Sequence, residues 1–364
     1  MCTSPRSLQE FAARIDEPEF AEVRAFYRVR NAQAIPMIFD EVGWAEASRV
    51  LDADKAAVER QTLLFVQSRH LGHEAVLNPF RGRRSGRGAS SDAAEIVDRE
   101  LAENGCAWCD PSRWHVAQGS RLVEQFGEIR SRDGRFRACP NWARLSTLSG
   151  IAYGDERAHN LFRLQREDFR ALFETASQYI LRSQRYRPSL RYFICFLNGG
   201  PRSAGSVPHA HVQILGREDS HFGIAEQVAR CCPRDYWKRI ADVHESIGLA
   251  HPIGDSKAWA NLCPVKERDV TLVSSDLVSG AAAIFEVLRA LIQSGTTSFS
   301  LAAIIKPQNE PTDSRFDQWP VVWRFVDRGD IRAAHADIGS LELLGGTSGV
   351  ATDPWSVARF IQNS

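Results

Sequence analysis

Two histidines and a glutamine alternate with small and apolar residues in the stretch His209-Ala210-His211-Val212-Gln213. If this stretch is a β-strand, the three polar side chains share one face, because successive side chains point to opposite faces. A neutral imidazole can attack phosphorus and form a covalent phosphoramidate, and an amide can donate a hydrogen bond to a phosphate oxygen. The pattern therefore favours His211 as a nucleophile and Gln213 as a phosphate contact over two histidines buried in a core. Because an amide is neither acid nor base, Gln213 also favours group transfer over hydrolysis.

The segment before this strand is rich in glycine and suited to phosphate. Backbone N–H groups, hydroxyl groups and guanidinium groups are the donors that phosphate oxygens need. The candidate phosphate contacts are Asn198, Gly199, Gly200, Arg202, Gly205 and Ser206. The basic segment 81–87, with Arg81 and Arg84, is either a solvated loop or a second phosphate-facing loop, since arginine forks match phosphate oxygens. Asn141 is a further candidate contact.

Cys106-Ala107-Trp108-Cys109 has the C-x-x-C spacing with which two thiolates bind one zinc ion. A tetrahedral site needs two further nitrogen or sulfur ligands, and the sequence contains no second C-x-x-C. The candidates for the missing ligands are His115, Cys139, His159, His209 and the Cys231-Cys232 pair. A redox pair, or two unrelated core cysteines, are the alternatives to a metal site.

The elements around these residues alternate between strands and single helices. Strands are expected at 148–153 and 191–198, and the second of these leads into the glycine-rich segment. An amphipathic helix is expected between them, with Phe169, Leu172 and Phe173 on its buried side. The first 58 residues show helical spacing, for example at Leu8, Phe11, Ala12 and Ile15, and no catalytic signature. Segments 59–220 and 221–364 both combine strands with one strong helix, which predicts two similar α+β units.

Length and composition are those of an ordinary globular protein. The chain has 364 residues, 43% of them hydrophobic, and equal numbers of basic and acidic residues, 45 each. This balance gives no global attraction to nucleic acid or to a membrane surface. No apolar run has the length of a membrane span, and the first residues lack the apolar core of a signal peptide. Cytoplasmic location is therefore expected, and the eight cysteines are expected to be thiols or metal ligands.

The H-x-H-x-Q stretch, preceded by Asn198-Gly199-Gly200 and Gly205-Ser206, resembles the signature of the galactose-1-phosphate uridylyltransferase branch of the histidine-triad superfamily. Dinucleoside tetraphosphate phosphorylases belong to the same branch. The resemblance implies that His211 is the nucleophile and that Gln213 and Ser206 contact phosphate. It covers about residues 62–216 by motif and residues 250–364 by layout. Ala210 stands where the uridylyltransferases usually have proline, and the second half contains no H-x-H.

The resemblance also implies a zinc site and an architecture. Its zinc positions fall on Cys106, Cys109, His159 and His209, which makes the metal structural. It implies an α+β fold of two histidine-triad-like halves, each an antiparallel sheet with packed helices. The helical extension of residues 1–58 lies outside the family pattern. A ping-pong mechanism and a homodimer are further implications.

The sequence thus predicts a nucleotidylyltransferase that works through a covalent nucleotidyl-histidine. It would move a nucleoside monophosphate group from a nucleotide sugar or nucleoside triphosphate to a phosphate acceptor such as a sugar 1-phosphate. One alternative is a phosphorylase of dinucleoside polyphosphates or nucleotide sugars, which would use inorganic phosphate. Another is a zinc-stabilised nucleotide-binding protein without catalysis. A nucleic-acid binder is disfavoured, because no basic surface with interleaved aromatic residues is evident.

Overall fold

The structure of the chain is a computed structural model. It describes residues 4–36, 38–59, 61–83, 93–104, 106, 108–109, 129–141, 144–203, 205, 207–308, 314–331 and 337–363. Within these ranges, no helix is long and apolar enough to cross a membrane.

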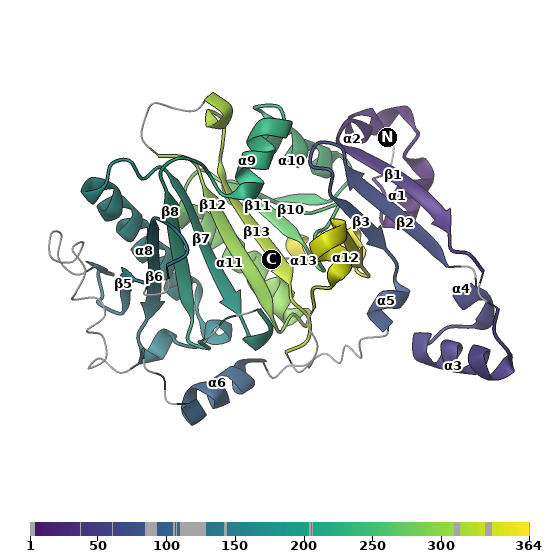
Figure 1. The fold of residues 1–364 in the computed structure, drawn as a ribbon, viewed down its shortest axis with the longest axis horizontal. Helices are drawn as coiled ribbons and strands as arrows, with labels where there is room; N and C mark the ends of the chain where they lie inside the picture. Colours follow the sequence, from purple (N-terminus) through teal and green to yellow (C-terminus); the bar gives the residue numbers. More distant parts are fainter. Residues whose placement is uncertain are drawn as a thin grey trace.

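A ten-stranded sheet forms the body of the molecule (Figure 1). Its order is β4-β5-β6-β8-β7-β12-β13-β11-β10-β9, and every neighbouring pair is antiparallel. The strands of the first half are β4 (Ile129–Arg130), β5 (Phe136–Pro140), β6 (Leu148–Gly154), β7 (Tyr192–Gly199) and β8 (His211–Arg217). Those of the second half are β9 (Ala250–Ile253), β10 (Ser256–Ala260), β11 (Val270–Ser274), β12 (Phe299–Ile305) and β13 (Val321–Asp327). The order is symmetric about the β7–β12 pair, which confirms the predicted two-part α+β architecture.

Two long helices pack on one face of this sheet, one from each half. They are α8 (Arg166–Tyr186) and α11 (Leu277–Gln293), and they also contact each other. The first begins where the Asp168 side chain accepts a hydrogen bond from the Gln165 backbone N–H at 3.4 Å, and it buries Phe169, Leu172 and Phe173 as predicted. At the start of the second, the Asp276 side chain accepts hydrogen bonds from two backbone N–H groups of the first turn. Both helices therefore leave the opposite face of the sheet to other elements.

One row of directly paired residues crosses that opposite face from end to end. In order across the strands it consists of Cys139, Ile151, Gln213, Phe196, Ala302, Arg324, Thr271 and Trp259. Directly opposed residues of antiparallel strands point to the same face, so all eight side chains do so. A pseudo-twofold axis between Phe196 and Ala302 relates the two ends of the row. Gln213 and Arg324 occupy equivalent positions.

A second sheet, of order β1-β2-β3-β14, is built from both ends of the described chain. Its strands are β1 (Tyr27–Gln33), β2 (Thr62–Ser68), β3 (Glu74–Leu77) and β14 (Thr347–Val350). The last strand pairs in parallel with β3. The helices that precede β2 are α1 (Leu8–Arg14), α2 (Ala21–Phe26), α3 (Glu41–Leu51) and α4 (Lys55–Glu59), with the 3₁₀ turn η1 (Pro18–Phe20). The expected helical extension is therefore present but interrupted: a helix across Tyr27–Gln33 is wrong, because this segment pairs with β2 along its whole length.

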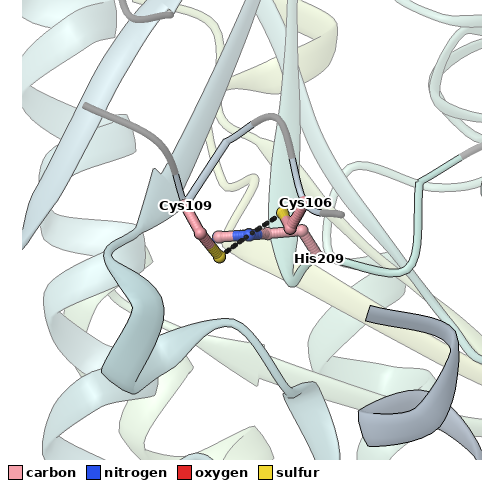
Figure 2. A group of neighbouring side chains, drawn as sticks. All are labelled: Cys106, Cys109 and His209. Carbon is pink, nitrogen blue, oxygen red and sulfur yellow. Dashed lines mark hydrogen bonds between the residues drawn. The ribbon is translucent and has the colours of Figure 1, made fainter. Parts of the chain in front are cut away.

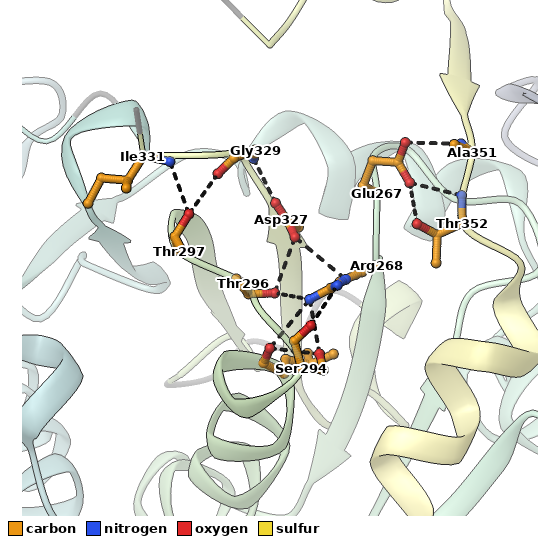
Figure 3. Close-up of polar contacts among 11 residues, drawn as sticks. Glu267, Arg268, Ser294, Thr296, Thr297, Asp327, Gly329, Ile331, Ala351 and Thr352 are labelled. Carbon is orange, nitrogen blue, oxygen red and sulfur yellow. Dashed lines mark hydrogen bonds and ion pairs between the residues drawn. The ribbon is translucent and has the colours of Figure 1, made fainter. Parts of the chain in front are cut away.

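Glu267 and its neighbours attach this small sheet to the second half of the large one (Figure 3). The Glu267 carboxylate accepts hydrogen bonds from the backbone N–H groups of Ala351 and Thr352, directly after β14. Arg268, the next residue, donates to Thr296 at 2.7 Å and pairs with Asp327 at the end of β13. One short loop thus ties the end of β14 to the ends of the second-half strands.

The remaining helices lie around these two sheets. They are α5 (Phe80–Arg83), α6 (Ala93–Asn104), α9 (Gly223–Cys231), α10 (Tyr236–Ser246), α12 (Ser340–Gly345) and α13 (Pro354–Gln362). Figure 1 shows α9 and α10 between the large sheet and the small N-terminal sheet. The 3₁₀ turns η3 (Glu156–Ala158), η4 (Leu161–Arg163), η5 (Pro201–Ser203) and η6 (Ser314–Phe316) lie in connections. One contiguous hydrophobic core joins both halves and the small sheet.

Candidate active site

His211 is the first residue of β8 and lies on the face of the sheet opposite α8. Its Nδ1 is 2.8 Å from the backbone carbonyl oxygen of His209. Since a carbonyl can only accept, Nδ1 carries the proton and donates it, and Nε2 is left with its lone pair. Burial lowers the pKa of His211, which favours the neutral, nucleophilic ring. The hydrogen bond expected for an oriented imidazole is therefore present.

Aromatic rings surround this imidazole. Trp108, inside the C-x-x-C stretch, meets the His211 ring edge to face with centroids 4.9 Å apart. Tyr153 of β6 is paired directly with His211 in the sheet, and its ring lies 5.1 Å from that of Trp108. The side chain of His211 is therefore enclosed by apolar surface, while Nδ1 is held by the backbone. Such an environment excludes water from the reacting nitrogen and strengthens electrostatic interactions there.

Gln213 follows on the same face of β8, in the next cross-strand row. It is half-buried beside Ile151 and Phe196, its direct partners on β6 and β7. Its side-chain amide makes no hydrogen bond to any described residue, so its N–H donors are available to a ligand. This places one imidazole and one side-chain amide in adjacent rows, as the alternating sequence predicts.

In the glycine-rich segment between β7 and β8, the backbone passes close to β12 and to the residues just before that strand. Gly200 has a φ of +77°, and a Cβ there would lie 2.7 Å from the Thr297 carbonyl oxygen. A Cβ at Gly199 would lie 2.4 Å from the Phe299 ring. Gly205 has more room, since a Cβ there would have its closest neighbour at 3.6 Å. Two of the three glycines are thus demanded by packing.

The other predicted phosphate contacts of this segment have different surroundings. Asn198 ends up beside Ser300 of β12, whose hydroxyl donates to its side-chain oxygen at 3.1 Å. Its amide N–H groups remain as donors. Arg202 is half-buried on η5. Ser206 lies outside the described residues.

The two cysteines of the C-x-x-C stretch meet His209, which lies two residues before β8 and not, as predicted, within the strand (Figure 2). Cys106 Sγ lies 3.1 Å and Cys109 Sγ 3.5 Å from Nδ1 of His209. The three ligand atoms lie within 4.8 Å of one another. His159 approaches from the other side, with its Nδ1 3.4 Å from Cys109 Sγ. These four residues are the ones that the family resemblance selects, and they converge from three separate segments.

The donor set fits zinc. Tetrahedral zinc with usual bond lengths separates a sulfur from a nitrogen ligand by about 3.6 Å, close to the separations seen here. His209 Nε2 donates to the Gly154 carbonyl oxygen at 3.0 Å, which leaves Nδ1 unprotonated and aimed at the two sulfurs. Burial lowers the pKa of His209 to about 4, so this ring is neutral near pH 7. Burial, with the neighbouring Cys106 sulfur, raises the pKa of Cys109 to about 12, a penalty that a bound cation would remove.

Helix α6 holds the cysteines and His159 together. Asn160 donates to Asp98 of α6 at 2.6 Å and to the Ala94 carbonyl at 2.8 Å. Arg163 pairs with the same aspartate at 2.6 Å. Because α6 leads directly to Cys106, these contacts fix the thiols against the η3–η4 segment. The Ala210 N–H donates to the His159 carbonyl, which joins that segment to the catalytic strand.

Several sequence candidates lie elsewhere. Arg81 is exposed on α5, beside Gly349 of β14, far from β8 (Figure 1). Arg84 and His115 lie outside the described residues. Asn141 follows β5, where its backbone N–H bonds to Ser149 of β6, two rows from the His211 row. Cys139 packs with Ile151, Tyr153 and Trp108, and the Cys231-Cys232 pair lies at the end of α9; none of these three cysteines joins the metal-ligand group among the described residues.

Three residues of this site were missed by sequence reasoning. Trp108 and Tyr153 pack against His211, as described above. Arg137 of β5 is paired directly with Tyr153, so it shares the row of His211. An aromatic residue inside the C-x-x-C spacing was a visible signal for Trp108, whereas Tyr153 and Arg137 depend on strand register.

Comparison with known proteins supports the fold. No family model matches the sequence, and no curated protein matches it. Among solved structures, ADP-glucose phosphorylase from Arabidopsis thaliana, with bound ADP-glucose, matches with a TM-score of 0.61 and 11% identity over 82% of this chain and 98% of its own. A GalT-like protein from Arabidopsis thaliana matches at 0.53, with 12% identity over 65% of this chain and 87% of its own. A uridylyltransferase matches at 0.52, with 14% identity over 63% of this chain and 84% of its own. The chain therefore shares its fold with ADP-glucose phosphorylase, the GalT-like protein and the uridylyltransferase.

Proposed function

We propose that this chain is a nucleotidyl-transfer enzyme that carries a nucleoside monophosphate group on His211. The observation that carries the proposal is the hydrogen bond from His211 Nδ1 to the His209 carbonyl, which leaves Nε2 as a fixed, unprotonated nucleophile. The fold shared with ADP-glucose phosphorylase and a uridylyltransferase supports it.

In the first step, Nε2 of His211 attacks the α-phosphorus of a nucleotide donor. The N–P bond forms as the bond from phosphorus to the leaving-group oxygen breaks, and the leaving group departs with its own phosphate. The proton stays on Nδ1, and the His209 carbonyl oxygen that accepts its hydrogen bond stabilises the positive charge that the ring acquires. Gln213 donates to a non-bridging oxygen of the transferred phosphate, where negative charge develops.

In the second step, an oxygen of a phosphate acceptor attacks the same phosphorus and the N–P bond breaks. His211 returns to its neutral form with the Nδ1 hydrogen bond unchanged. A phosphate acceptor is already ionised near pH 7, so no general base is required at the position of Gln213. A water nucleophile would need one.

A structural zinc ion held by Cys106, Cys109, His159 and His209 belongs to the same proposal. Zinc would supply positive charge that keeps both cysteines as thiolates and fixes the approach to β8. It takes no part in the transfer itself, because His209 Nδ1 lies beside the sulfurs whereas His211 Nδ1 is hydrogen-bonded to a backbone carbonyl.

Two acceptors are consistent with this chemistry. A sugar 1-phosphate makes the enzyme a transferase, and inorganic phosphate makes it a phosphorylase. The likeness to ADP-glucose phosphorylase, over almost the whole of that chain, favours testing inorganic phosphate with nucleotide sugars first.

Covalent labelling tests the proposal. The wild type, incubated with α-³²P-labelled nucleoside triphosphates and nucleotide sugars without acceptor, should retain acid-labile label on the denatured chain. The variant His211→Asn should retain none, because its amide cannot form a phosphoramidate. Adding phosphate or a sugar 1-phosphate should discharge the label, and mass spectrometry of the product identifies the acceptor.

The matched control is His251→Asn on β9, which makes the same change at a histidine in the second half. It should label as the wild type does. Equal labelling of His211→Asn and wild type, or an unlabelled wild type with every donor, would contradict the proposal.

A further inference from the structure

The second half of the large sheet carries a cavity of about 420 Å³ on the same face as His211 and Gln213. Its floor consists of Trp259, Thr271, Ile304 and Arg324, from four adjacent strands. Three of these four belong to the cross-sheet row, at the end opposite Cys139 and Gln213. The cavity is thus the second half's counterpart of the candidate active site, with Arg324 at the position of Gln213.

The N-terminal sheet and two helices close the cavity. Its roof comes from Tyr27 of β1 and from the turn between β2 and β3. Its walls come from Ile224 and Gln227 of α9 and from Tyr236 and Trp237 of α10. The N-terminal extension, which lies outside the family pattern, therefore has a definite place: it covers the second-half face of the sheet.

The charge inside the cavity has one sign. Arg324 is the one permanently charged side chain among the residues that line it. Its partner Asp269 is fully buried, and accepts from Arg324 at 2.6 Å, from Asn261 at 2.7 Å and from the Val265 N–H at 2.8 Å. The aspartate is therefore saturated with donors and shielded. Arg324 remains 24% exposed, toward the cavity, with one of its five N–H groups used by the aspartate.

The remaining lining is aromatic and weakly polar. Four rings line the cavity, those of Tyr27, Tyr236, Trp237 and Trp259. The volume falls within the range of small-molecule sites, which combine apolar walls with a few placed polar groups. A guanidinium presented between aromatic walls suits an oxyanion attached to a flat ring.

We propose that this cavity is a second ligand site, which binds a small organic anion through Arg324 and holds its ring between the tyrosine and tryptophan side chains. The anionic group is a carboxylate or a phosphate monoester. The site is separate from His211 and does not depend on the function proposed above.

Isothermal titration with three probes tests this site: inorganic phosphate, benzoate and adenosine monophosphate. The decisive variant is Ile224→Trp, which fills the mouth of the cavity from an α9 position that is 39% exposed and leaves the Arg324–Asp269 pair intact. At least one ring-bearing probe should bind the wild type at least tenfold more tightly than it binds Ile224→Trp. A comparison of the affinities for benzoate and adenosine monophosphate shows whether the site prefers a carboxylate or a phosphate ligand.

Arg324→Met should also abolish this binding. If the loss of the arginine impairs folding, Ile224→Trp still tests the site, because it keeps the Arg324–Asp269 pair. Ile224→Trp should label at His211 as the wild type does, which keeps failure of this site distinct from failure of the transfer chemistry. Equal affinity of wild type and Ile224→Trp for every probe, or no binding of any probe at roughly 5 mM, would overturn the proposal.

Discussion

At equivalent positions of the ten-stranded sheet, the first half carries His211 and Gln213 and the second half carries Val322 and Arg324. Gln213 makes no hydrogen bond to a described residue, whereas Arg324 is paired with a buried carboxylate. The same backbone register thus carries an amide without a hydrogen-bond partner among the described residues in one half and an internally paired arginine in the other.

The connections after β6 and β11 differ in the same way. In the first half, residues 155–165 separate β6 from α8 and contribute His159. In the second half, Ser275 and Asp276 alone separate β11 from α11. Among the described residues, the group that could hold a metal ion, Cys106, Cys109 and His209, lies in the first half. The sheet register fixes the face to which each side chain points, and the loops between sheet and helices determine which ligands can be bound there.

Removal of the metal should produce the largest difference in hydrogen-exchange protection between the two halves. Chelation, or Cys106→Ser, should lower stability by about 5 kcal/mol, a fall in Tm of roughly 10 °C, because two half-buried sulfurs and two imidazoles lose their shared cation. Hydrogen exchange should quicken around β8 and leave β13 protected. Metal analysis should find about one zinc ion per chain. Cys231→Ser, at an exposed thiol, is the matched control and should change neither property. A metal-free wild type of equal stability would refute the zinc site.

Substitution within the cross-sheet row should separate catalysis from stability. Arg324→Met should lower stability by about 3 kcal/mol, because it leaves Asp269 as an uncompensated buried charge, and should leave covalent labelling intact. Gln213→Ala should do the reverse: transfer should slow by about a hundredfold, with a stability change within about 0.5 kcal/mol. Urea denaturation and turnover assays of both variants measure the contrast. Similar effects of the two variants on both quantities would remove the functional distinction between the halves.

A shift to mildly acidic pH should produce the smallest loss of stability, and this loss should arise from histidines of the second half. Burial lowers the pKa of His221 and of His244 to about 4. Each ring also accepts a backbone N–H, from Phe222 and from Leu262, which protonation would break. Their contribution to stability is therefore full above the unfolded pKa of about 6.5 and is lost as the pH falls toward 4. The expected loss is about 1 kcal/mol per ring between pH 7 and pH 5.5. Urea denaturation across this range should show a shallower decline in His244→Gln, and an unchanged slope would contradict this assignment.

Much of the first-half site was predictable because the residues that carry its chemistry form short motifs in the sequence. The alternation His211-Val212-Gln213 places two polar side chains on one face of β8, and the C-x-x-C spacing names the two cysteines that meet His209. Arg324 gave no such signal, since its significance depends on a register that joins strands separated by more than a hundred residues. The strand Tyr27–Gln33 was missed because it follows a short helix directly and exposes most of its side chains, which weakens any period-two pattern. Arg81, read as a phosphate contact from its charge, lies on α5 beside the small sheet.

The parallel pairing of β14 with β3 also bears on how the chain is made. Residues 74–77 leave the ribosome long before their partners at 347–350 are synthesised, an interval on the order of tens of seconds at usual elongation rates. Throughout that interval one edge of β3 has no partner strand, and the Glu267 carboxylate, made late in the interval, gains its hydrogen bonds only when Ala351 and Thr352 follow. The small sheet is therefore completed last although most of its strands are made first. Until β14 has been made, a nascent chain would therefore lack the strand that pairs with this edge of β3.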